Sequence, residues 1–466
     1  MFLRTDDFNL ILATDGYKIT HWKQYPLGTE IVYAYLESRG GKFASTIFFG
    51  LQYYLRRYLA GAVVTQEKID EADTKMRAYF GADYFNREGW EYILREHGGR
   101  LPVSIRAVPE GTDVPTGNVL MTIENTDPKC YWLTNYLETM LMQVWYPTTV
   151  ATLSNYVRRK LLGYLRRTGS DAGIDYMLHD FGYRGVSSQE SAGLGDAGHL
   201  LNFNGTDTIA GIELLRDHYY GQCSAILASS IPASEHSTIT SWGEENEVAA
   251  MRNMLTAYPS GPVACVSDSY NIWRACSEYW GRDLRMDINK RDGTLIVRPD
   301  SGKPELVDVK CLELLGEAFG FQENGRGYKV LNPKVRLIQG DGIEYDTLDS
   351  ILDAMIHAGW AAENIAFGSG GGLLQKLDRD TQRFAFKCSA IRVNGQWRDV
   401  YKDPVTDPGK VSKRGRLRLV QAVGGALSTT TDEGGGDMLV EVFRNGRVFV
   451  DQSLDDIRAR ARRAAG

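Results

Sequence analysis

A short apolar segment that ends in polar residues and leads into a helical stretch recurs along the second half of the chain. The clearest instances are VACVSDSYN (263–271), TLIVRPDSG (294–302), VRLIQGDG (335–342) and NIAFGSGGG (364–372). Successive polar ends, counted from Asp268 to Gly370, are 32, 41 and 29 residues apart. That spacing accommodates a strand, a crossover helix and two loops, so the pattern predicts parallel strands covered by helices on both faces.

Polar residues stand at the carboxyl end of each of these predicted strands. We therefore expect an α/β fold with a βα barrel, whose active-site loops gather at that end. A doubly wound open sheet is the alternative, because it binds ligands at the same edge. We assign the barrel to residues 151–395 and an N-terminal α/β lobe to residues 1–150. Residues 396–466, where the composition shifts to Lys, Arg, Pro and Gly, are expected to lie outside the barrel.

Other segments carry clear local signals. IVYAYLESRGG (31–41) alternates like a strand, and MLVEVFRNGRVFVDQS (438–453) predicts a hairpin around Asn-Gly. The expected helices are TQEKIDEADTKMRAYFG (65–81), the apolar YWLTNYLETMLMQVWYP (131–147) that proline ends, DTLDSILDAMIHAGW (346–360) and the terminal SLDDIRARARRAAG (453–466).

The composition excludes several classes of protein. The 466 residues carry a net charge of −6, so no overall basic field points to nucleic acid. No segment approaches the ~20 apolar residues of a membrane span, and MFLRTDDFNLILATD (1–15) lacks the basic and apolar regions of a signal peptide. The six cysteines form no CxxC pair and no zinc pattern with histidine. We expect reduced thiols, no metal-ligating residues and a cytoplasmic location.

A glycine-rich loop lies between the last predicted strand and a helix expected to begin near Leu373. Its glycines are Gly368, Gly370, Gly371 and Gly372. Glycine lets backbone N–H groups approach an anion closely, and a helix N-terminus adds about half a positive charge. A flexible turn is the alternative, but glycines at this junction favour a phosphate site.

Two aspartates end successive predicted strands, Asp300 in RPDSG and Asp341 in GDG. A carboxylate accepts two hydroxyl hydrogen bonds, which is how proteins hold a ribose. Arg298, two residues before Asp300, points to the same side of its strand and offers a phosphate or carbonyl contact. A lone aspartate at a strand end is often only a helix cap.

Basic residues follow the glycine loop in a protein that is acidic overall. They are Arg379, Lys387, Lys402 and Lys410. Such a set suits a pyrophosphate, and a solvated loop is the alternative of equal weight.

Two further segments combine groups that suit a heteroaromatic ligand and phosphate chemistry. LHDFGYRGVSSQE (178–190) holds Phe181, a core residue by default that could stack on a planar ring. SSIPASEHSTITSW (229–242) places His236 beside Glu235 on a polar loop.

The stretch GLGDAG (193–198) fits the dinucleotide motif G-x-G-x-x-G literally. The preceding SSQESA is no buried strand, so the strand–turn–helix context that gives the motif its meaning is missing.

Taken together, these segments resemble the nicotinamide phosphoribosyltransferase family. The matching segments, in the family's order from about residue 9 to 458, are NLILATDGYKITHWKQYP, LPVSIRAVPEGTDVPTGNVLMTIENTDPKCYWLTN, LHDFGYRGVSSQE, FNGTDTIAG, PASEHSTITSWG, VSDSYNI, IVRPDSG, IQGDG and IAFGSGGGLLQKLDRD. The resemblance implies the type II phosphoribosyltransferase fold, an irregular α/β barrel with a second lobe to which residues 396–466 return. It also implies a homodimer with active sites at the interface.

The resemblance implies a glycosyltransferase, specifically a pentosyltransferase. The family joins nicotinamide to 5-phosphoribosyl 1-pyrophosphate (PRPP), giving nicotinamide mononucleotide and pyrophosphate in NAD salvage, with Mg²⁺. ATP is a facultative co-substrate that phosphorylates the histidine matching His236. Loss of pyrophosphate leaves an oxocarbenium-like sugar, so cations must stabilise the leaving group and ribose contacts must fix the anomeric carbon.

The family's residue roles transfer by motif. Phe181 and Tyr17, the latter from the partner subunit, would sandwich the pyridine, with Asp207 accepting from the amide and Ser230 close by. Asp300, Gly340 and Asp341 would hold the ribose, and Gly370 and Gly371 the 5′-phosphate. Phosphate and pyrophosphate would bind Arg39, Arg184, Arg298, Arg379, Lys387, Lys402 and Lys410. The catalytic residues would be His236, Arg298 and Asp300.

Asp207 would decide which base binds. A carboxylate facing the amide accepts nicotinamide and repels nicotinate, since two like charges ~4 Å apart at an effective dielectric near 20 cost about 4 kcal/mol. Nicotinate phosphoribosyltransferase activity and a catalytically silent nucleotide-binding relative are the alternatives. The chain departs from the animal members in RDHYYGQCSAILASS (216–230) and in GLGDAG, both near the expected base pocket.

Overall fold

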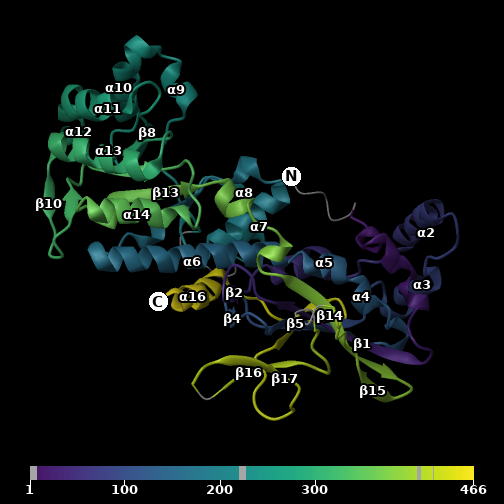
Figure 1. Cartoon of the computed structure of the whole chain (residues 1–466). Coiled ribbons are helices and arrows are strands. Elements are labelled where there is room, and N and C mark those ends of the chain that lie inside the picture. The colour runs from purple at the N-terminus through teal and green to yellow at the C-terminus, as the bar shows by residue number, and fades with distance from the viewer. Residues whose placement is uncertain (1–7, 220–226, 407–410, 423) are drawn as a thin grey trace. The chain divides into compact units, whose positions relative to one another are not determined.

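The computed structural model describes residues 8–219, 227–406, 411–422 and 424–466 (Figure 1). The chain divides into two compact units. Unit 1 comprises Met1–Thr152, Leu214–Ser224 and Leu377–Ala464, and unit 2 comprises Leu153–Glu213, Ala225–Lys376 and Ala465–Gly466. Within the described residues, no helix is long and apolar enough to cross a membrane.

Unit 2 is built on a six-stranded sheet in the order β7-β6-β13-β12-β9-β8. The strands are β6 (Leu178–Asp180), β7 (Gly205–Thr206), β8 (Val263–Val266), β9 (Leu295–Arg298), β12 (Val335–Gln339) and β13 (Ile365–Ser369). All neighbouring pairs are parallel. The four strands predicted from the repeating pattern are β8, β9, β12 and β13, which confirms the parallel sheet.

The sheet curls toward closure through one short segment between its edges. Ser229 bridges in parallel to Gly205 on β7, and Ala233 bridges in parallel to Ala264 on β8. Because residues 229–233 thus pair with both edge strands, the unit is an irregular barrel rather than an open sheet. The predicted barrel is confirmed over the doubly wound alternative.

Helices alternate with these strands along the chain or flank them (Figure 1). They are α6 (Trp145–Thr168), α7 (Gln189–His199), α8 (Ile209–Tyr219), α9 (His236–Thr240), α10 (Glu247–Ala257), α11 (Ile272–Arg274), η9 (Ala275–Asp283), α12 (Arg285–Lys290), α13 (Pro304–Phe319), α14 (Thr347–His357) and α15 (Gly371–Leu374). In α14 the predicted apolar face, Leu348, Ile351, Leu352, Met355 and Ile356, is buried. A short hairpin, β10 (Phe321–Glu323) and β11 (Lys329–Leu331), follows α13.

Unit 1 contains a seven-stranded sheet in the order β15-β14-β1-β5-β3-β18-β19. Its strands are β1 (Thr29–Ser38), β3 (Val103–Ala107), β5 (Val119–Asn125), β14 (Phe384–Val393), β15 (Gln396–Asp399), β18 (Val440–Arg444) and β19 (Arg447–Val448). The pairs are antiparallel. Two small pairs, β2 (Ser45–Ile47) with β4 (Asp113–Pro115) and β16 (Arg418–Gln421) with β17 (Leu427–Thr430), accompany it.

The local predictions in unit 1 are confirmed with one exception. Helix α2 (Gln66–Phe80) starts at Thr65, whose side chain accepts from the backbone of Lys68. Helix α3 (Arg87–His97) follows it, and α16 (Leu454–Ala465) is the predicted terminal helix. The β18–β19 turn has positive φ at Asn445 and Gly446, as an Asn-Gly hairpin requires.

The exception is the apolar segment 131–147, which is not one helix ended by proline. It forms two short helices, α4 (Leu133–Tyr136) and α5 (Glu138–Met142), and α6 then begins at Trp145. Pro147 therefore lies in the first turn of α6. Proline is tolerated there because the first N–H groups of a helix have no acceptor within the helix.

The division of the chain also differs from the predicted boundary at residue 395. Strand β14 pairs with β1 from Thr29↔Val393 to Ser38↔Phe384. Residues 377–395 accordingly belong to unit 1 rather than to the barrel. The predicted boundary follows the change in composition. The observed boundary follows backbone pairing of β14 with β1, a strand some 350 positions earlier in the chain.

Candidate active site

A cavity of about 1080 Å³ opens at the carboxyl ends of the parallel strands in unit 2. Nine residues predicted for the site line it: Phe181, Arg184, Asp207, Arg298, Asp300, Gly340, Asp341, Gly370 and Gly371. They come from loops that follow β6, β7, β12 and β13 and from the end of β9 and its loop. The prediction that these strand ends meet at one edge is confirmed.

The glycine loop lies where β13 ends and shapes the floor of this cavity. A Cβ added at Gly368 would lie 1.9 Å from Cε2 of Phe181, so the aromatic ring packs directly on this glycine backbone. A Cβ at Gly371 would meet no protein atom within 4 Å. Gly368 thus makes room for the ring, whereas Gly371 leaves its backbone open to the cavity, as a bound phosphate requires.

The helix predicted to continue from this loop is short. Helix α15 covers only Gly371–Leu374, and Arg379 lies in a separate turn, η11 (Arg379–Thr381). Asp378 has an extended backbone and caps that turn, because its side chain accepts a hydrogen bond from the backbone N–H of Thr381. The helix expected to begin near Leu373 therefore ends before it reaches Arg379.

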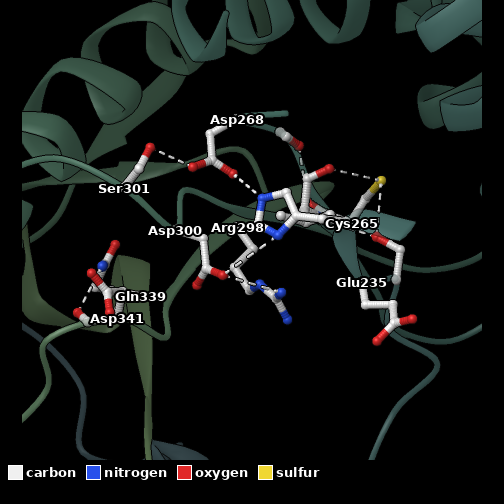
Figure 2. Close-up of polar contacts among 12 residues, drawn as sticks. Glu235, Cys265, Asp268, Arg298, Asp300, Ser301, Gln339 and Asp341 are labelled. Atoms are coloured by element: carbon white, nitrogen blue, oxygen red, sulfur yellow. Dashed lines mark hydrogen bonds and ion pairs between the residues drawn. The ribbon is translucent and has the colours of Figure 1, made fainter. Parts of the chain in front are cut away.

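Arginine and carboxylate groups stand together at the next strand ends (Figure 2). The Nη2 of Arg298 lies 3.5 Å from Oδ2 of Asp300. Gln339 donates from Nε2 to the backbone oxygen of Asp341 at 3.0 Å, which fixes the turn after β12. The Nε of Arg298 is buried without a hydrogen-bond partner in the structure. A buried guanidinium N–H of this kind calls for an acceptor such as a substrate oxygen.

His236 begins α9 and faces two aspartates. Its Nε2 lies 3.1 Å from Oδ1 of Asp268, and its Nδ1 lies 4.0 Å from Oδ2 of Asp300. Asp268 is 5% exposed in its side chain and also accepts from the hydroxyl of Ser301 at 2.5 Å (Figure 2). The imidazole is 45% exposed, so one ring nitrogen is held by a buried carboxylate while the ring stays accessible. A carboxylate that fixes one imidazole nitrogen leaves the other available for proton or phosphoryl transfer.

The carboxylate beside His236 in the sequence is not its partner. Glu235 accepts from the hydroxyl of its neighbour Ser237 and lines the cavity. The sequence argument rested on adjacency, whereas strand β8 brings Asp268 to the ring. Asp268 and Ser301 are functional candidates that sequence reasoning missed, although Asp268 stands at the end of a predicted strand.

Asp207, which directly follows β7, also lines the cavity and is exposed. Its Oδ1 accepts from the hydroxyl of Ser230. Its backbone N–H donates to the carbonyl of Asp180 at 3.0 Å. A ring on Phe181 and an exposed carboxylate on the same cavity suit a planar base that carries an N–H donor.

Comparison with known proteins places these features in one family. A model described as the nicotinate phosphoribosyltransferase (NAPRTase) family matches residues 176–447, and one described as the nicotinamide phosphoribosyltransferase N-terminal domain matches residues 9–105. The nicotinamide phosphoribosyltransferase of Xanthomonas campestris pv. campestris (strain 8004) is 53% identical over 465 residues, 97% of this chain and 98% of the relative. That of Acinetobacter baylyi is 34% identical over 97% of each chain. This chain belongs to the nicotinamide phosphoribosyltransferase family.

Solved structures support the same fold. The nicotinate-nucleotide pyrophosphorylase of Pyrococcus furiosus superposes with a TM-score of 0.63 at 15% identity, covering 100% of this chain and 97% of that one. Human nicotinic acid phosphoribosyltransferase superposes with a TM-score of 0.55 at 17% identity, covering 97% and 93%. At such identities the likeness concerns the fold alone, and it confirms the predicted type II phosphoribosyltransferase architecture.

Other residues that the family resemblance selected belong to unit 1. Burial lowers the pKa of Lys387, and the charges of Arg39 and Lys402 near it lower that pKa further. Arg39 also contacts Glu37 at 2.9 Å. Tyr17 is exposed and packs edge-on against His21 at 4.8 Å between ring centroids, and Arg379 lies beside Asp380. Lys410 lies outside the described residues. The structure thus gathers three of the predicted cations into one basic cluster.

Three side chains in unit 1 lie close enough together to be compared with a metal site, although the sequence predicts no metal-ligating residues. The ligand atoms of His97, Asp127 and Cys130 lie within 4.8 Å of one another, although no zinc spacing was visible in the sequence. Asp127 already uses its carboxylate to accept from His97, from Tyr92 and from the backbone of Lys129. Hydrogen bonding within the group therefore accounts for its geometry without an ion.

Proposed function

We propose that this chain condenses nicotinamide with PRPP to form nicotinamide mononucleotide and pyrophosphate in NAD salvage. One observation carries the proposal: a single cavity presents an aromatic ring with Asp207, two strand-end aspartates with Arg298, and an open glycine backbone. These are the groups needed for a base, a ribose and its 5′-phosphate, in that order.

The reaction follows from what these groups can do. The glycine backbone and the ribose contacts hold the sugar, and Phe181 with Asp207 holds the pyridine so that its ring nitrogen faces the anomeric carbon. The nitrogen attacks as the bond to pyrophosphate breaks, and the leaving group takes the bonding electron pair. Cationic side chains such as Arg298 stabilise the charge that develops on it. The base is itself the nucleophile, so no protein nucleophile is required.

We propose that Mg²⁺ accompanies PRPP. The strand-end carboxylates Asp300 and Asp341 are hard oxygen donors of the type that Mg²⁺ prefers. In the part of the chain that the structure describes, no trio of acidic, His or Cys groups at this cavity could hold an ion by itself. That donor set fits a cation bound mainly through substrate phosphates, where it would neutralise charge on the leaving pyrophosphate.

We propose further that ATP phosphorylates His236 and that this step promotes synthesis. The pair of Asp268 with the accessible imidazole supports the role, because the carboxylate would orient the ring and stabilise its charged form. Replacing His236 by alanine is expected to abolish both the phosphohistidine and the stimulation of synthesis by ATP. Asp268→Asn should lower ATP-dependent phosphorylation roughly ten-fold, since the amide no longer stabilises a charged ring.

Acid-labile ³²P incorporation from γ-labelled ATP, measured beside the rate with and without ATP, checks both changes. Glu235→Gln is the matched control, because Glu235 adjoins His236 in sequence but binds Ser237. Equal phosphorylation of wild type and Asp268→Asn would refute the role of Asp268. Absence of phosphohistidine in wild type would refute the ATP step as a whole.

We also propose that the enzyme works in the cytoplasm as a homodimer, with Tyr17 and Arg379 reaching the partner's active site. The exposed Tyr17 ring supports this, since a tyrosine left in solvent suits an interface or a ligand. Light scattering on the eluting protein tests the dimer. Mixing a Tyr17→Ala chain with an Asp300→Ala chain, which lacks a ribose contact, tests the shared site, because a complete site forms only if Tyr17 comes from the partner subunit.

The test of the reaction itself is direct. The protein is incubated with PRPP, Mg²⁺ and either nicotinamide or nicotinate, and the mononucleotide is quantified. We expect product from nicotinamide and little from nicotinate. The reverse preference would support nicotinate phosphoribosyltransferase, the second candidate, because residues 176–447 match the nicotinate phosphoribosyltransferase family. Product from neither base would leave a nucleotide-binding protein without this activity.

A further inference from the structure

Two carboxyl groups are buried together behind the base end of the cavity. Asp180 ends β6 and Asp196 lies within GLGDAG on α7, and both side chains are fully buried. The two carboxyl groups act on each other electrostatically. The Oδ2 atom of each is buried without a hydrogen-bond partner. Two ionised carboxylates in such a site would repel each other, which favours a single proton held by the pair.

The Asp180 side of this pair holds the loop that carries Phe181. Its Oδ1 accepts from the backbone N–H of Gly182 at 2.7 Å, and its carbonyl accepts from the backbone N–H of Asp207 at 3.0 Å. Asp180 therefore contacts the backbone of Asp207 and directly precedes Phe181 in the sequence. A change in its side chain would be transmitted to both walls of the base site.

The Asp196 side holds the turn that carries Asp207. Its Oδ1 accepts from the hydroxyl of Thr206 at 2.7 Å, and that hydroxyl oxygen accepts in turn from the backbone N–H of Thr208 at 2.8 Å. Asp207 is thus bracketed by two residues tied to Asp196. A Cβ added at Gly211 would lie 2.1 Å from Oδ2 of Asp196, so the start of α8 presses directly on the carboxyl group. The pair has no room to relax away from this arrangement.

We propose that the Asp180–Asp196 pair, which carries one proton and one negative charge, is a positioning and specificity-determining element of the base site. It would fix Phe181 and Asp207 in the geometry that a neutral carboxamide base needs. Its charge would add to that of Asp207 in excluding an anionic base. This inference rests on the proposed function, because it concerns selection between nicotinamide and nicotinate.

The electrostatic surroundings agree with one bound proton. Burial, followed by the nearby Asp180, raises the pKa of Asp196 well above its usual value. Burial also raises the pKa of Asp180 to about 6, although the hydrogen bond from Gly182 opposes this shift. Asp207, after β7, acts on both groups and raises their pKa further. His179 on β6 lies beside Gly205, and burial lowers its pKa, so this nearby histidine brings no positive charge at neutral pH.

Three variants separate positioning from charge. Asp196→Ala removes the acceptor for the Thr206 hydroxyl, and should raise KM for nicotinamide about ten-fold while KM for PRPP changes less than about two-fold. Asp196→Asn keeps an acceptor for Thr206 and supplies the shared hydrogen from its amide, so it should restore KM close to wild type. The double variant Asp180→Asn with Asp196→Asn keeps the acceptors for Gly182 and Thr206 but removes the charge. It should lower discrimination against nicotinate roughly five-fold.

A pH measurement provides a readout that does not depend on catalysis. A carboxyl group whose pKa is raised in the folded state contributes stability below its unfolded pKa and loses it as pH rises through the folded pKa. The melting temperature of wild type should therefore fall relative to that of Asp196→Asn as the pH is raised from about 5 to about 8. This comparison also serves if Asp196→Ala does not fold.

The outcomes distinguish the two levels of the proposal. Parallel melting curves for wild type and Asp196→Asn, or equal effects of Asp196→Ala on both substrates, would overturn the role of the pair while leaving the reaction intact. Failure of wild type to convert either base would overturn the proposed function and this inference with it. Selective loss of nicotinamide affinity, rescued by asparagine, would establish the pair as a positioning element.

Discussion

Replacing Gly368 by alanine is expected to raise KM for nicotinamide about 100-fold. The added methyl group would lie 1.9 Å from Cε2 and 2.2 Å from Cδ2 of Phe181. Such contacts are impossible, so the ring must leave the position in which it can stack on a base. Loss of an aromatic wall from a ligand site accounts for an effect of this size. Initial rates with nicotinamide varied at saturating PRPP measure it.

Gly371→Ala is the matched control for this substitution. It lies in the same loop, but its Cβ would meet no protein atom within 4 Å. It should leave KM for nicotinamide near its original value and act on KM for PRPP, because its side chain would enter the space assigned to the 5′-phosphate. If both variants changed the two KM values alike, the separation of base and phosphate along this loop would be wrong.

Replacing Asp207 by asparagine is expected to reduce the preference for nicotinamide over nicotinate about 30-fold. The wild-type carboxylate accepts from the amide of nicotinamide and repels the carboxylate of nicotinate. Asparagine removes the repulsion and can donate to an anionic base. Asp207 is exposed to solvent, which screens the interaction and keeps the expected effect well below that of a buried pair. The ratio of kcat/KM for the two bases, measured in wild type and variant, gives the change.

Ser230→Ala provides the comparison, because Ser230 donates its hydroxyl to Asp207. It should change the affinity for nicotinamide modestly and keep the discrimination against nicotinate, since the charge remains. An equal ratio of kcat/KM for the two bases in wild type and Asp207→Asn would show that this carboxylate does not determine the specificity.

The strand ends could be located from the sequence because they depend on a local pattern. Each apolar run that ends in Asp or Gly becomes a strand of the parallel sheet, and the carboxyl ends of parallel strands share one edge. Arg298, Asp300 and the glycine loop therefore meet in one cavity as expected. The length of α15 could not be predicted in the same way. The apolar residues of LLQKL favour a longer helix, but α15 ends at Leu374 and Asp378 caps a separate turn.

Partners of the functional groups were less accessible to sequence reasoning. His236 was paired with Glu235 by adjacency, but Asp268 holds its ring, 32 residues away. In the sequence, Asp196 stands out only as part of GLGDAG, which matches the dinucleotide-binding motif without its structural context. Its burial and its hydrogen bond from Thr206 depend on the packing of elements apart in the sequence, which no local rule describes.

The sequence by itself determined the parallel barrel, the residues at its strand ends and, through the order of its motifs, the family. These features follow from periodicity and from residue types at fixed positions along the chain. Only the tertiary structure decided which carboxylate holds His236, why Gly368 must lack a side chain and that two aspartates are buried beside the base-binding loops. Each of these depends on distances between residues remote in sequence, and such distances are set by packing rather than by local pattern.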